Sequence, residues 1–232
     1  MTSWYHPSIL VGMVSRRFNF GVILLFGLWL TACQTVSSTA PLMDPSDPLW
    51  QTAAPAEFRA RFETTRGEFV IRVEREWAPI GVDRFYHLVR AGFFDDSRFF
   101  RVIEGFIVQF GIPGDPAVSA VWRNRQMADD PVGASNDKGR IAYAMTGPDT
   151  RTTQLYISLT DNSRLDADGF APIGEVESGM EVVEKIYSGY GEEAGGGMRR
   201  GNQDRMFQEG NQHLDQDSPK LDRILRVAIV GQ

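Results

Sequence analysis

The chain has 232 residues, of which 42% are hydrophobic and 23% are charged, an ordinary composition for a globular protein with one domain or one domain and a small extra. Its formal net charge of −6 and pI near 5.2 argue against a nucleic-acid-binding protein, which usually presents a basic face. The single cysteine and the three histidines are scattered without metal-ligand spacing, so we expect no metal site.

The N-terminal region has the pattern of a secretory signal peptide. Arg16 and Arg17 precede the uncharged run FNFGVILLFGLWLTA, which is shorter than the roughly 20 apolar residues that a transmembrane helix needs. A basic region, an apolar region and small residues before the cleavage site are typical of such signals. We predict a signal peptide over residues 1–32, with Met13 as a possible true start; an uncleaved membrane anchor is the alternative.

The end of this run, LTAC, resembles the lipobox of bacterial lipoproteins. That resemblance implies cleavage before Cys33 and acylation of this cysteine, which would tie the protein to a membrane by its lipid. Gln34, as the residue after Cys33, favours the outer membrane, with the protein facing the periplasm of the cell envelope. Residues 33–56 are rich in Ser, Thr, Pro and Ala and predict a flexible tether, although Trp50 is expected to dock on the domain.

The rest of the chain, residues 57–232, has the pattern of a mainly β domain. The alternating runs FRARFETT and GEFVIRVE predict an antiparallel hairpin, and APIGVDRFYHLVRAGFF predicts a helix that begins near Pro79. Further short strands are predicted in GRIAYAM, QLYISLT, APIGEV and RILRVAIV, and a second helix in MEVVEKIYS. Many short strands with two helices predict a closed or nearly closed antiparallel β-barrel capped by helices.

A Gly-rich insertion over about residues 188–220 separates the second helix from the last strand. Its glycines follow a helix and lack the spacing of a phosphate-binding loop, so a surface excursion with a short helix near 206–214 is expected. The sequence contains no Gly-x-Ser-x-Gly nucleophile motif. Acidic pairs such as Asp129–Asp130 have turn-like contexts, which leaves a carboxylate-pair hydrolase open but not favoured.

The segment SRFFRVIEGFIVQFG, residues 97–111, has the pattern of an apolar hairpin, yet it contains Arg101 and Gln109. A two-residue turn at 104–105 would place these side chains on opposite faces, whereas a three-residue loop at 104–106 would place them opposite each other. The turn chemistry does not decide between these registers. The cost of burying unpaired polar groups favours the second register, with both polar side chains on one apolar face.

Three blocks of the chain, in family order, resemble cyclophilins, the cyclosporin-binding class of peptidyl-prolyl cis-trans isomerases. FFRVIEGFIVQFG is similar to the family's FHRVIxGFMxQGG, GRIAYAMTGPDTRTTQLYISL to GxLSMANxGPNTNGSQFFI, and LDADGFAPIGEVESGMEVVEKI to WLDGKHxVFGxVxxGMDVVxxI. The resemblance spans about Phe58 to Val230. It implies a cyclophilin-like barrel of about eight strands, catalysis of X-Pro isomerisation without a cofactor, proline-containing polypeptides as partners and a monomer.

The resemblance also implies roles for individual residues. Arg101 corresponds to the catalytic arginine, whose hydrogen bond to the prolyl nitrogen favours the twisted amide, and Gln109 to the glutamine that holds the substrate backbone. Binding the twisted amide more tightly than either planar form is sufficient for catalysis, because the barrier of about 18–20 kcal/mol comes from amide resonance. The residues that the resemblance implies in substrate binding are Phe106, Ile107, Met145, Gln154, Tyr156, Leu165 and Phe170.

Six positions depart from the family pattern: Phe100 for His, Phe110 for Gly, Met145 for Asn, Tyr156 for Phe, Arg164 for Trp and Phe170 for His. On strand alternation Phe100 faces away from Arg101 and packs inside. Arg164 replaces a residue that contributes strongly to cyclosporin binding, so we expect weak cyclosporin affinity with isomerase activity retained. Nothing in the sequence explains Phe110.

The sequence therefore predicts a lipid-anchored isomerase that accelerates X-Pro isomerisation during the folding of envelope proteins. Two alternatives remain: a chaperone-like module that binds proline peptides with little turnover, and an envelope scaffold in which the insertion docks a partner. The physiological clients and the residue preferred before proline are not specified by the sequence.

Overall fold

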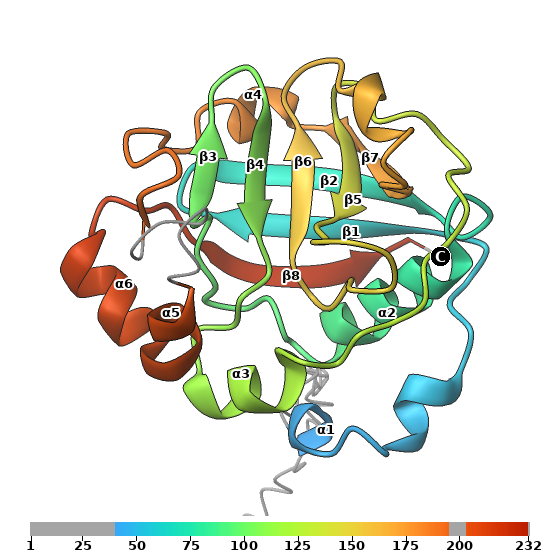
Figure 1. The fold of residues 1–232 in the computed structure, drawn as a ribbon, viewed down its shortest axis with the longest axis horizontal. Helices are drawn as coiled ribbons and strands as arrows, with labels where there is room; N and C mark the ends of the chain where they lie inside the picture. The colour runs from blue at the N-terminus through green and yellow to red at the C-terminus, as the bar shows by residue number, and fades with distance from the viewer. Residues whose placement is uncertain (1–39, 195–202, 232) are drawn as a thin grey trace, which may run out of the picture. The chain divides into compact units, whose positions relative to one another are not determined.

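The computed structural model describes residues 40–194 and 203–231, and their fold is mainly β (Figure 1). Alternating burial along the first two strands shows why they form: apolar side chains of each strand enter the core while the charged ones between them face outward. The strands are β1 (Glu57–Thr64), β2 (Gly67–Glu74), β3 (Arg101–Ile103), β4 (Ile107–Phe110), β5 (Arg140–Tyr143), β6 (Leu155–Ser158), β7 (Pro172–Ser178) and β8 (Ile224–Val230).

The eight strands form one antiparallel sheet in the order β3-β4-β6-β5-β7-β2-β1-β8. The sheet curls, so that β3, β4, β6 and β5 cross in front of β1, β2 and β8 (Figure 1). Its two edges meet only just before β3 and β8, where Arg98 forms an isolated bridge with Arg223 and the Phe99 amide donates to Asp222 O at 3.0 Å. The predicted mainly β fold with about eight antiparallel strands is confirmed; the sheet is a curled half-barrel whose two edges are linked by this bridge and not by a ladder.

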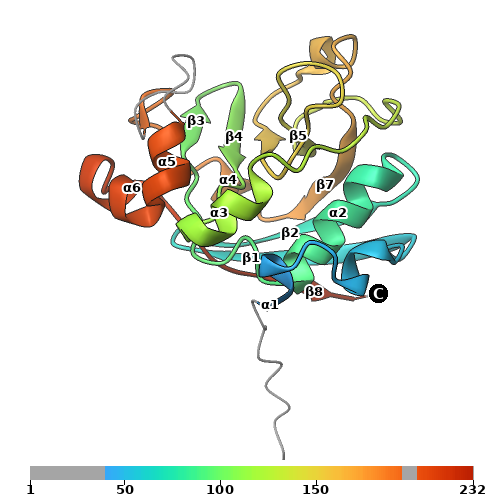
Figure 2. The ribbon, with the colours of Figure 1, turned by 60° about the horizontal axis from the view of Figure 1, so that its bottom comes forward.

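The helices cap the curled sheet. The two predicted helices are α2 (Pro79–Arg90), which begins at the predicted proline, and α4 (Met180–Val183), which is a single turn and shorter than expected. The described residues also form α1 (Ala40–Met43), α3 (Pro116–Trp122), α5 (Asp204–Glu209), α6 (Asn211–Asp217) and the short 3₁₀ helices η1 (Pro48–Gln51) and η2 (Ser163–Leu165). Figure 2 shows α1, α2 and α3 along one side of the sheet, with α5 next to α3.

The main core between the halves of the sheet and α2 is rich in phenylalanine, and it gives Phe110 a physical explanation. The Phe110 ring is fully buried and makes edge-on contacts with Phe62, Phe94 and Phe99 at centroid distances of 5.6–5.8 Å. Because side chains alternate along a strand, Phe110 points into the core while its neighbour Gln109 points to the other face. The large side chain therefore fills the core and does not crowd the polar face.

A second, smaller core joins the Gly-rich insertion to the sheet. Phe100 is buried together with Ile112 from the segment after β4 and with Met206 and Leu214 from α5 and α6. The expectation that Phe100 packs inside is confirmed. One short helix was predicted near residues 206–214, and the structure has two, α5 and α6. Their apolar residues hold the described part of the insertion against the strand that carries Arg101.

The described part of the predicted tether is docked on the domain. Leu42 is buried, its carbonyl accepts a hydrogen bond of 2.8 Å from Trp122 Nε1, and Trp50 packs edge-on against the Trp122 ring at 4.7 Å. The predicted docking of Trp50 is thus confirmed, whereas residues 40–56 are held by packing and hydrogen bonds rather than being a free linker. The predicted signal peptide and Cys33 lie outside the described residues.

None of the helices within 40–194 and 203–231 is long and apolar enough to cross a membrane.

Candidate active site

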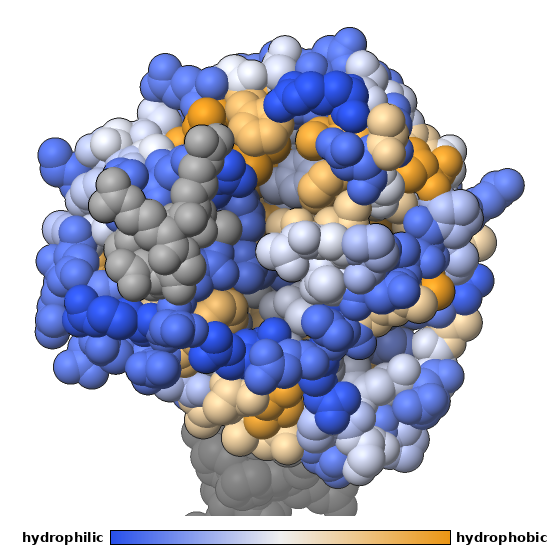
Figure 3. All heavy atoms as spheres, viewed as in Figure 1, coloured by the Kyte–Doolittle hydropathy of each residue, from blue (hydrophilic) through white to orange (hydrophobic). Residues whose placement is uncertain are grey.

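A pocket of about 460 Å³ opens on the outer face of β3, β4 and β6, on the side away from the phenylalanine core. In Figure 3 this face is hollowed near its centre, with apolar side chains gathered beside the hollow. The pocket is lined by Arg101, Phe106, Ile107, Gln109, Arg123, Ala144, Met145, Thr146, Thr150, Thr152, Gln154, Tyr156, Leu165, Phe170, Gln203, Asp204 and Phe207. All nine residues that the sequence placed in the site are among them, although their roles stay predictions.

The β3–β4 hairpin places a guanidinium and an amide side by side. Its register pairs Arg101 with Gln109 and Ile103 with Ile107, which confirms the predicted three-residue connection. Gly105 has φ +66°, a left-handed conformation that glycine adopts without strain, and the Phe106 amide donates to Ile103 O at 3.0 Å. The turn therefore accommodates the register that brings both polar side chains to the pocket face.

A chain of side-chain hydrogen bonds crosses the pocket floor from strand to strand. Arg101 Nη1 donates to Gln109 Oε1 at 3.1 Å, and Gln109 Nε2 donates to Gln154 Oε1 at 3.0 Å. Gln154 Nε2 in turn donates to Gln203 Oε1 at 3.3 Å. Gln109 is 2% exposed, so these bonds satisfy an amide that burial would otherwise destabilise.

Arg101 has a second fixed partner, the carboxylate of Glu192 in the insertion. Arg101 Nη2 donates to Glu192 Oε1 at 2.6 Å, and the two side chains are 16% and 21% exposed. The Arg101 Nε is buried and finds no hydrogen-bond acceptor among the described residues. The guanidinium is therefore held at two nitrogens and keeps other N–H groups for a ligand in the pocket.

The apolar part of the pocket is a cluster in which Ile107 and Tyr156 are buried and Phe106, Leu165 and Phe170 pack against them. The Tyr156 and Phe170 rings meet edge-on at a centroid distance of 5.9 Å. Such a surface suits a proline ring, because a ligand pocket combines apolar walls with a few placed polar groups.

The hydroxyl of Tyr156, absent where the family has Phe, is satisfied from behind the pocket. It donates to Asn136 Oδ1 at 2.7 Å, and burial raises the pKa of Tyr156 well above its usual value, so it stays neutral. Asn136 in turn donates to Asp166 Oδ1 and to Phe170 O, each at 2.7 Å. Burial alone would raise the pKa of Asp166, but hydrogen bonds from Ser135 and Asn136 outweigh it and hold that pKa below its usual value. The ionised Asp166 thus supports the pocket wall.

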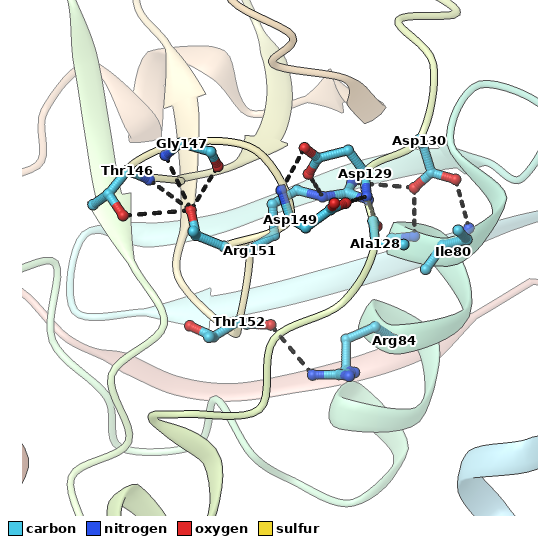
Figure 4. A network of polar contacts seen from close by, with 12 residues as sticks. Ile80, Arg84, Ala128, Asp129, Asp130, Thr146, Gly147, Asp149, Arg151 and Thr152 are labelled. Atoms are coloured by element: carbon cyan, nitrogen blue, oxygen red, sulfur yellow. Dashed lines mark hydrogen bonds and ion pairs between the residues drawn. The ribbon is translucent and has the colours of Figure 1, made fainter.

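The loop between β5 and β6, which carries Met145 and three threonines of the pocket, is fastened to α2 by a buried network (Figure 4). Asp130 accepts hydrogen bonds of 2.8 Å from the amides of Ile80 and Gly81, so it caps α2 where Ala78, the N-cap residue, offers no side-chain acceptor. Arg151, which is 1% exposed, donates to Asp130 Oδ2 at 3.1 Å and forms an ion pair of 2.9 Å with Asp129. The predicted local turn role of these two aspartates is therefore wrong, because their side chains bind groups at least 20 positions away along the chain.

The same loop is closed at its tip by Thr150 and Asp149 (Figure 4). Thr150 Oγ1 accepts from the amides of Thr146 and Gly147 at 2.9 and 3.1 Å, and the Asp149 amide donates to Asp129 Oδ2 at 2.7 Å. Thr146, Thr150 and their neighbours are therefore presented to the pocket by a loop that is fixed at both its base and its tip.

Sequence reasoning missed the residues that close the far side of the pocket. Arg123 follows α3, and the start of this helix could have been recognised from the sequence. The Asp115 side chain accepts a hydrogen bond from the Ala117 amide, and Pro116 occupies the first turn. Gln203, Asp204 and Phe207 come from the insertion, and no local pattern places them at the pocket. Their position depends on the small core around Phe100.

Across the described residues, no group of three or more His, Cys, Asp or Glu side chains could hold a metal ion. The pocket instead offers a fixed cation, amides and threonine hydroxyls around an apolar patch. This arrangement can bind a peptide backbone, seat a small apolar ring and donate hydrogen bonds to it, and none of these steps requires a covalent intermediate.

A family model described as cyclophilin type peptidyl-prolyl cis-trans isomerase/CLD matches residues 59–208. The chain is 29% identical over 181 residues to peptidyl-prolyl cis-trans isomerase B of Escherichia coli (strain K12), covering 74% of this chain and 98% of that protein. It is 32% identical over 139 residues to peptidyl-prolyl cis-trans isomerase A of Dickeya dadantii (strain 3937), covering 58% of this chain and 73% of that protein.

Among solved structures, the chain is similar to a cyclophilin type peptidyl-prolyl cis-trans isomerase of Cryptosporidium parvum, with a TM-score of 0.55 and 20% identity over 76% of this chain and 99% of that one. The same protein crystallised in the presence of the dipeptide Ala-Pro gives a TM-score of 0.53 with 19% identity, over 75% of this chain and 99% of that one. At these identities the likeness concerns the fold.

The network behind the pocket loop makes a prediction for stability. Asp130→Ala removes the cap of α2 and one of the carboxylates that compensate the buried Arg151, so the free energy of unfolding should fall by about 3–5 kcal/mol. Urea unfolding followed by circular dichroism measures this loss. Asp168→Ala, in an exposed turn, is the matched control and should change stability by less than about 0.5 kcal/mol. Equal stability of the two variants would contradict the assigned role of the network.

Proposed function

This chain belongs to the cyclophilin-type peptidyl-prolyl cis-trans isomerase family and is an enzyme of that class, and from this premise we propose that Arg101 is its catalytic residue. An X-Pro amide isomerises slowly because resonance holds the C–N bond planar. Twisting the bond localises a lone pair on the prolyl nitrogen. An N–H of the Arg101 guanidinium donates to that lone pair and so binds the twisted amide more tightly than either planar form.

The observation that carries this proposal is a guanidinium fixed at the edge of an apolar pocket with donors left over. Gln109 and Glu192 each take one of its five N–H groups, and the buried Nε has no acceptor among the described residues. Phe106 lies beside it, with Arg101 Cζ 5.9 Å from the ring centroid. A proline ring seated on Phe106 and Ile107 would bring its nitrogen to these donors.

The glutamines on the pocket floor complete the mechanism. Gln109 and Gln154 each use one amide hydrogen in the chain across the floor and keep a second one for a peptide carbonyl. Because both amides are held in one orientation, they fix the substrate backbone on one side of the twisting bond, while the part beyond that bond rotates. The substrate class is proline-containing polypeptides.

The first prediction for function concerns Arg101. Arg101→Ala should lower kcat/KM by about 100-fold or more in a protease-coupled assay of a proline peptide, because removing one preorganised donor typically has that effect. Arg101→Lys should recover little of this loss, since a lysine lacks the planar, multi-donor geometry.

The alternative function, a proline-peptide-binding module with little turnover, would give a different result. Wild type and Arg101→Ala would then be equally inactive while both still bind the peptide in a titration. The retained Arg101, both glutamines and the apolar cluster favour turnover over binding alone.

We further propose that cyclosporin binds weakly. Arg164 stacks on the Phe106 ring, with its Cζ 4.8 Å from the centroid, and donates to Asn162 Oδ1 at 3.1 Å. A charged side chain on this rim replaces the apolar surface that a large cyclic peptide would cover. Cyclosporin A should therefore inhibit the wild-type enzyme only at micromolar concentration or above in the same assay, and a nanomolar inhibition constant would contradict this proposal.

The cellular setting is also a proposal: a lipoprotein anchored through acylated Cys33 and facing the periplasm, where it acts on envelope proteins during folding. Its support is the LTAC motif after an apolar run, followed by Gln34. Several acyl chains give stable membrane attachment, because each buried CH₂ adds about 0.8 kcal/mol.

This setting predicts that Cys33→Ser releases the protein from the membrane. In a Gram-negative bacterial host that expresses the full chain, the wild type should sediment with outer-membrane vesicles and incorporate labelled palmitate. Cys33→Ser should lose the label, and Gln51→Ser, which lies beyond the predicted lipidation site, is the control that should keep it. Equal labelling of wild type and Cys33→Ser would refute acylation at this residue.

A further inference from the structure

The insertion places a carboxylate on each of the two arginines that line the pocket. Glu192 meets Arg101 at 2.6 Å, and Asp204, the first residue of α5, meets Arg123 at 2.6 Å. The insertion also supplies Phe207, whose ring lies 4.5 Å from Arg123 Cζ. Both pocket cations are therefore matched by an acid from the same segment of the chain.

We propose that Glu192, with Asp204 as a weaker second, determines substrate specificity by excluding acidic residues next to the isomerising bond. The inference rests on the proposed role of Arg101, because it concerns whether the same guanidinium would also attract an acidic side chain of the substrate. Without the carboxylates, two arginines in a half-enclosed pocket would form a positive site. With them, the charged residues Arg101, Arg123, Glu192 and Asp204 sum to zero.

Burial makes the Glu192 pair the stronger determinant. The Arg101 and Glu192 side chains are 16% and 21% exposed, whereas Arg123 and Asp204 are 31% and 64% exposed. Interactions between charges weaken as solvent access increases, because water and salt screen them. Removing the Glu192 charge should therefore change the potential in the pocket more than removing that of Asp204.

The residue before proline is the position that this potential selects. Its carbonyl carbon forms the amide bond that twists, so its side chain lies close to Arg101 whenever the prolyl nitrogen does. An acidic side chain there would be attracted to an uncompensated guanidinium and would divert its donors from the prolyl nitrogen. The Glu192 carboxylate already accepts from Arg101 Nη2 and balances its charge, so it would repel a second carboxylate.

The decisive variant is Glu192→Gln, which removes the charge but keeps a side-chain oxygen that can accept from Arg101 Nη2. Two peptides that differ by one charge, Ala-Glu-Pro-Phe and Ala-Gln-Pro-Phe, are compared by NMR exchange spectroscopy, which needs no coupling protease. The measured quantity is the ratio of kcat/KM for the two peptides. Any general change in the catalytic power of Arg101 affects both peptides and cancels in this ratio.

We expect Glu192→Gln to raise the acidic-to-neutral ratio by about tenfold at low ionic strength, with the gain shrinking in 0.5 M salt. Asp204→Asn should raise it by about threefold. Glu209→Gln is the matched control, because Glu209 lies in the same insertion, is exposed, pairs with Arg205 and changes the net charge equally; its ratio should stay within twofold of wild type.

An unchanged ratio in Glu192→Gln would overturn the proposal. If kcat/KM then fell by the same factor for both peptides, Glu192 would only orient Arg101. NMR titration also gives the dissociation constants of the same two peptides. Because affinity does not depend on turnover, this measurement tests the specificity proposal separately from the proposed catalysis by Arg101. If Arg101→Ala kept full turnover, the mechanism would fail, but the affinity ratio in Glu192→Gln would still decide the question of specificity.

Discussion

A guanidinium on an apolar hairpin must be satisfied by polar partners, and at Arg101 this requirement connects three distant parts of the chain. Gln109 lies across the hairpin, Gln154 holds Gln109 from the residue before β6, and Glu192 reaches Arg101 from the insertion. Each hydrogen bond restricts the rotation of the side chains that it joins. The result is a cation whose direction is set before a substrate arrives, which is the condition for electrostatic stabilisation of a twisted amide.

Strand alternation explains how one hairpin serves both the core and the site. Val108 and Phe110 enter the phenylalanine core, whereas Ile107 and Gln109 face the pocket. A shift of one residue in register would exchange these sets, burying Gln109 among phenylalanines and exposing Phe110. The core therefore fixes the register of β4, and the register fixes the face on which Gln109 and its partner Arg101 lie.

Local patterns made much of this predictable. The β1–β2 hairpin, the start of α2 at Pro79 and the pairing of Arg101 with Gln109 follow from alternation, a helix-start signal and the cost of an unpaired polar group. The resemblance to a family then indicated the pocket residues from three short motifs. The explanation of Phe110 needed the structure, because its neighbours Phe62, Phe94 and Phe99 come from separate elements.

The rest could not be predicted because it depends on contacts between residues far apart in the sequence. Glu192 is separated from Arg101 by 91 positions, and the carboxylate occurs in a glycine-rich stretch without periodicity. The docking of residues 40–54 was obscured in the same way, since a Pro- and Ser-rich composition suggests a linker. The partners Trp122, Asp83 and His87, all distant in the sequence, show that this segment is held.

The dipeptide Phe100–Arg101 shows why the insertion can influence the site at all. Phe100 packs with Met206 and Leu214, so α5 and α6 rest on the strand that begins at the next residue. Arg101 points to the pocket and meets Glu192 from the same insertion. An apolar anchor and an ionic contact thus act on adjacent residues of one strand. A surface excursion without its own core could not hold a carboxylate at a fixed distance, whereas one anchored by Phe100 can tune the charge of the pocket without rebuilding the barrel.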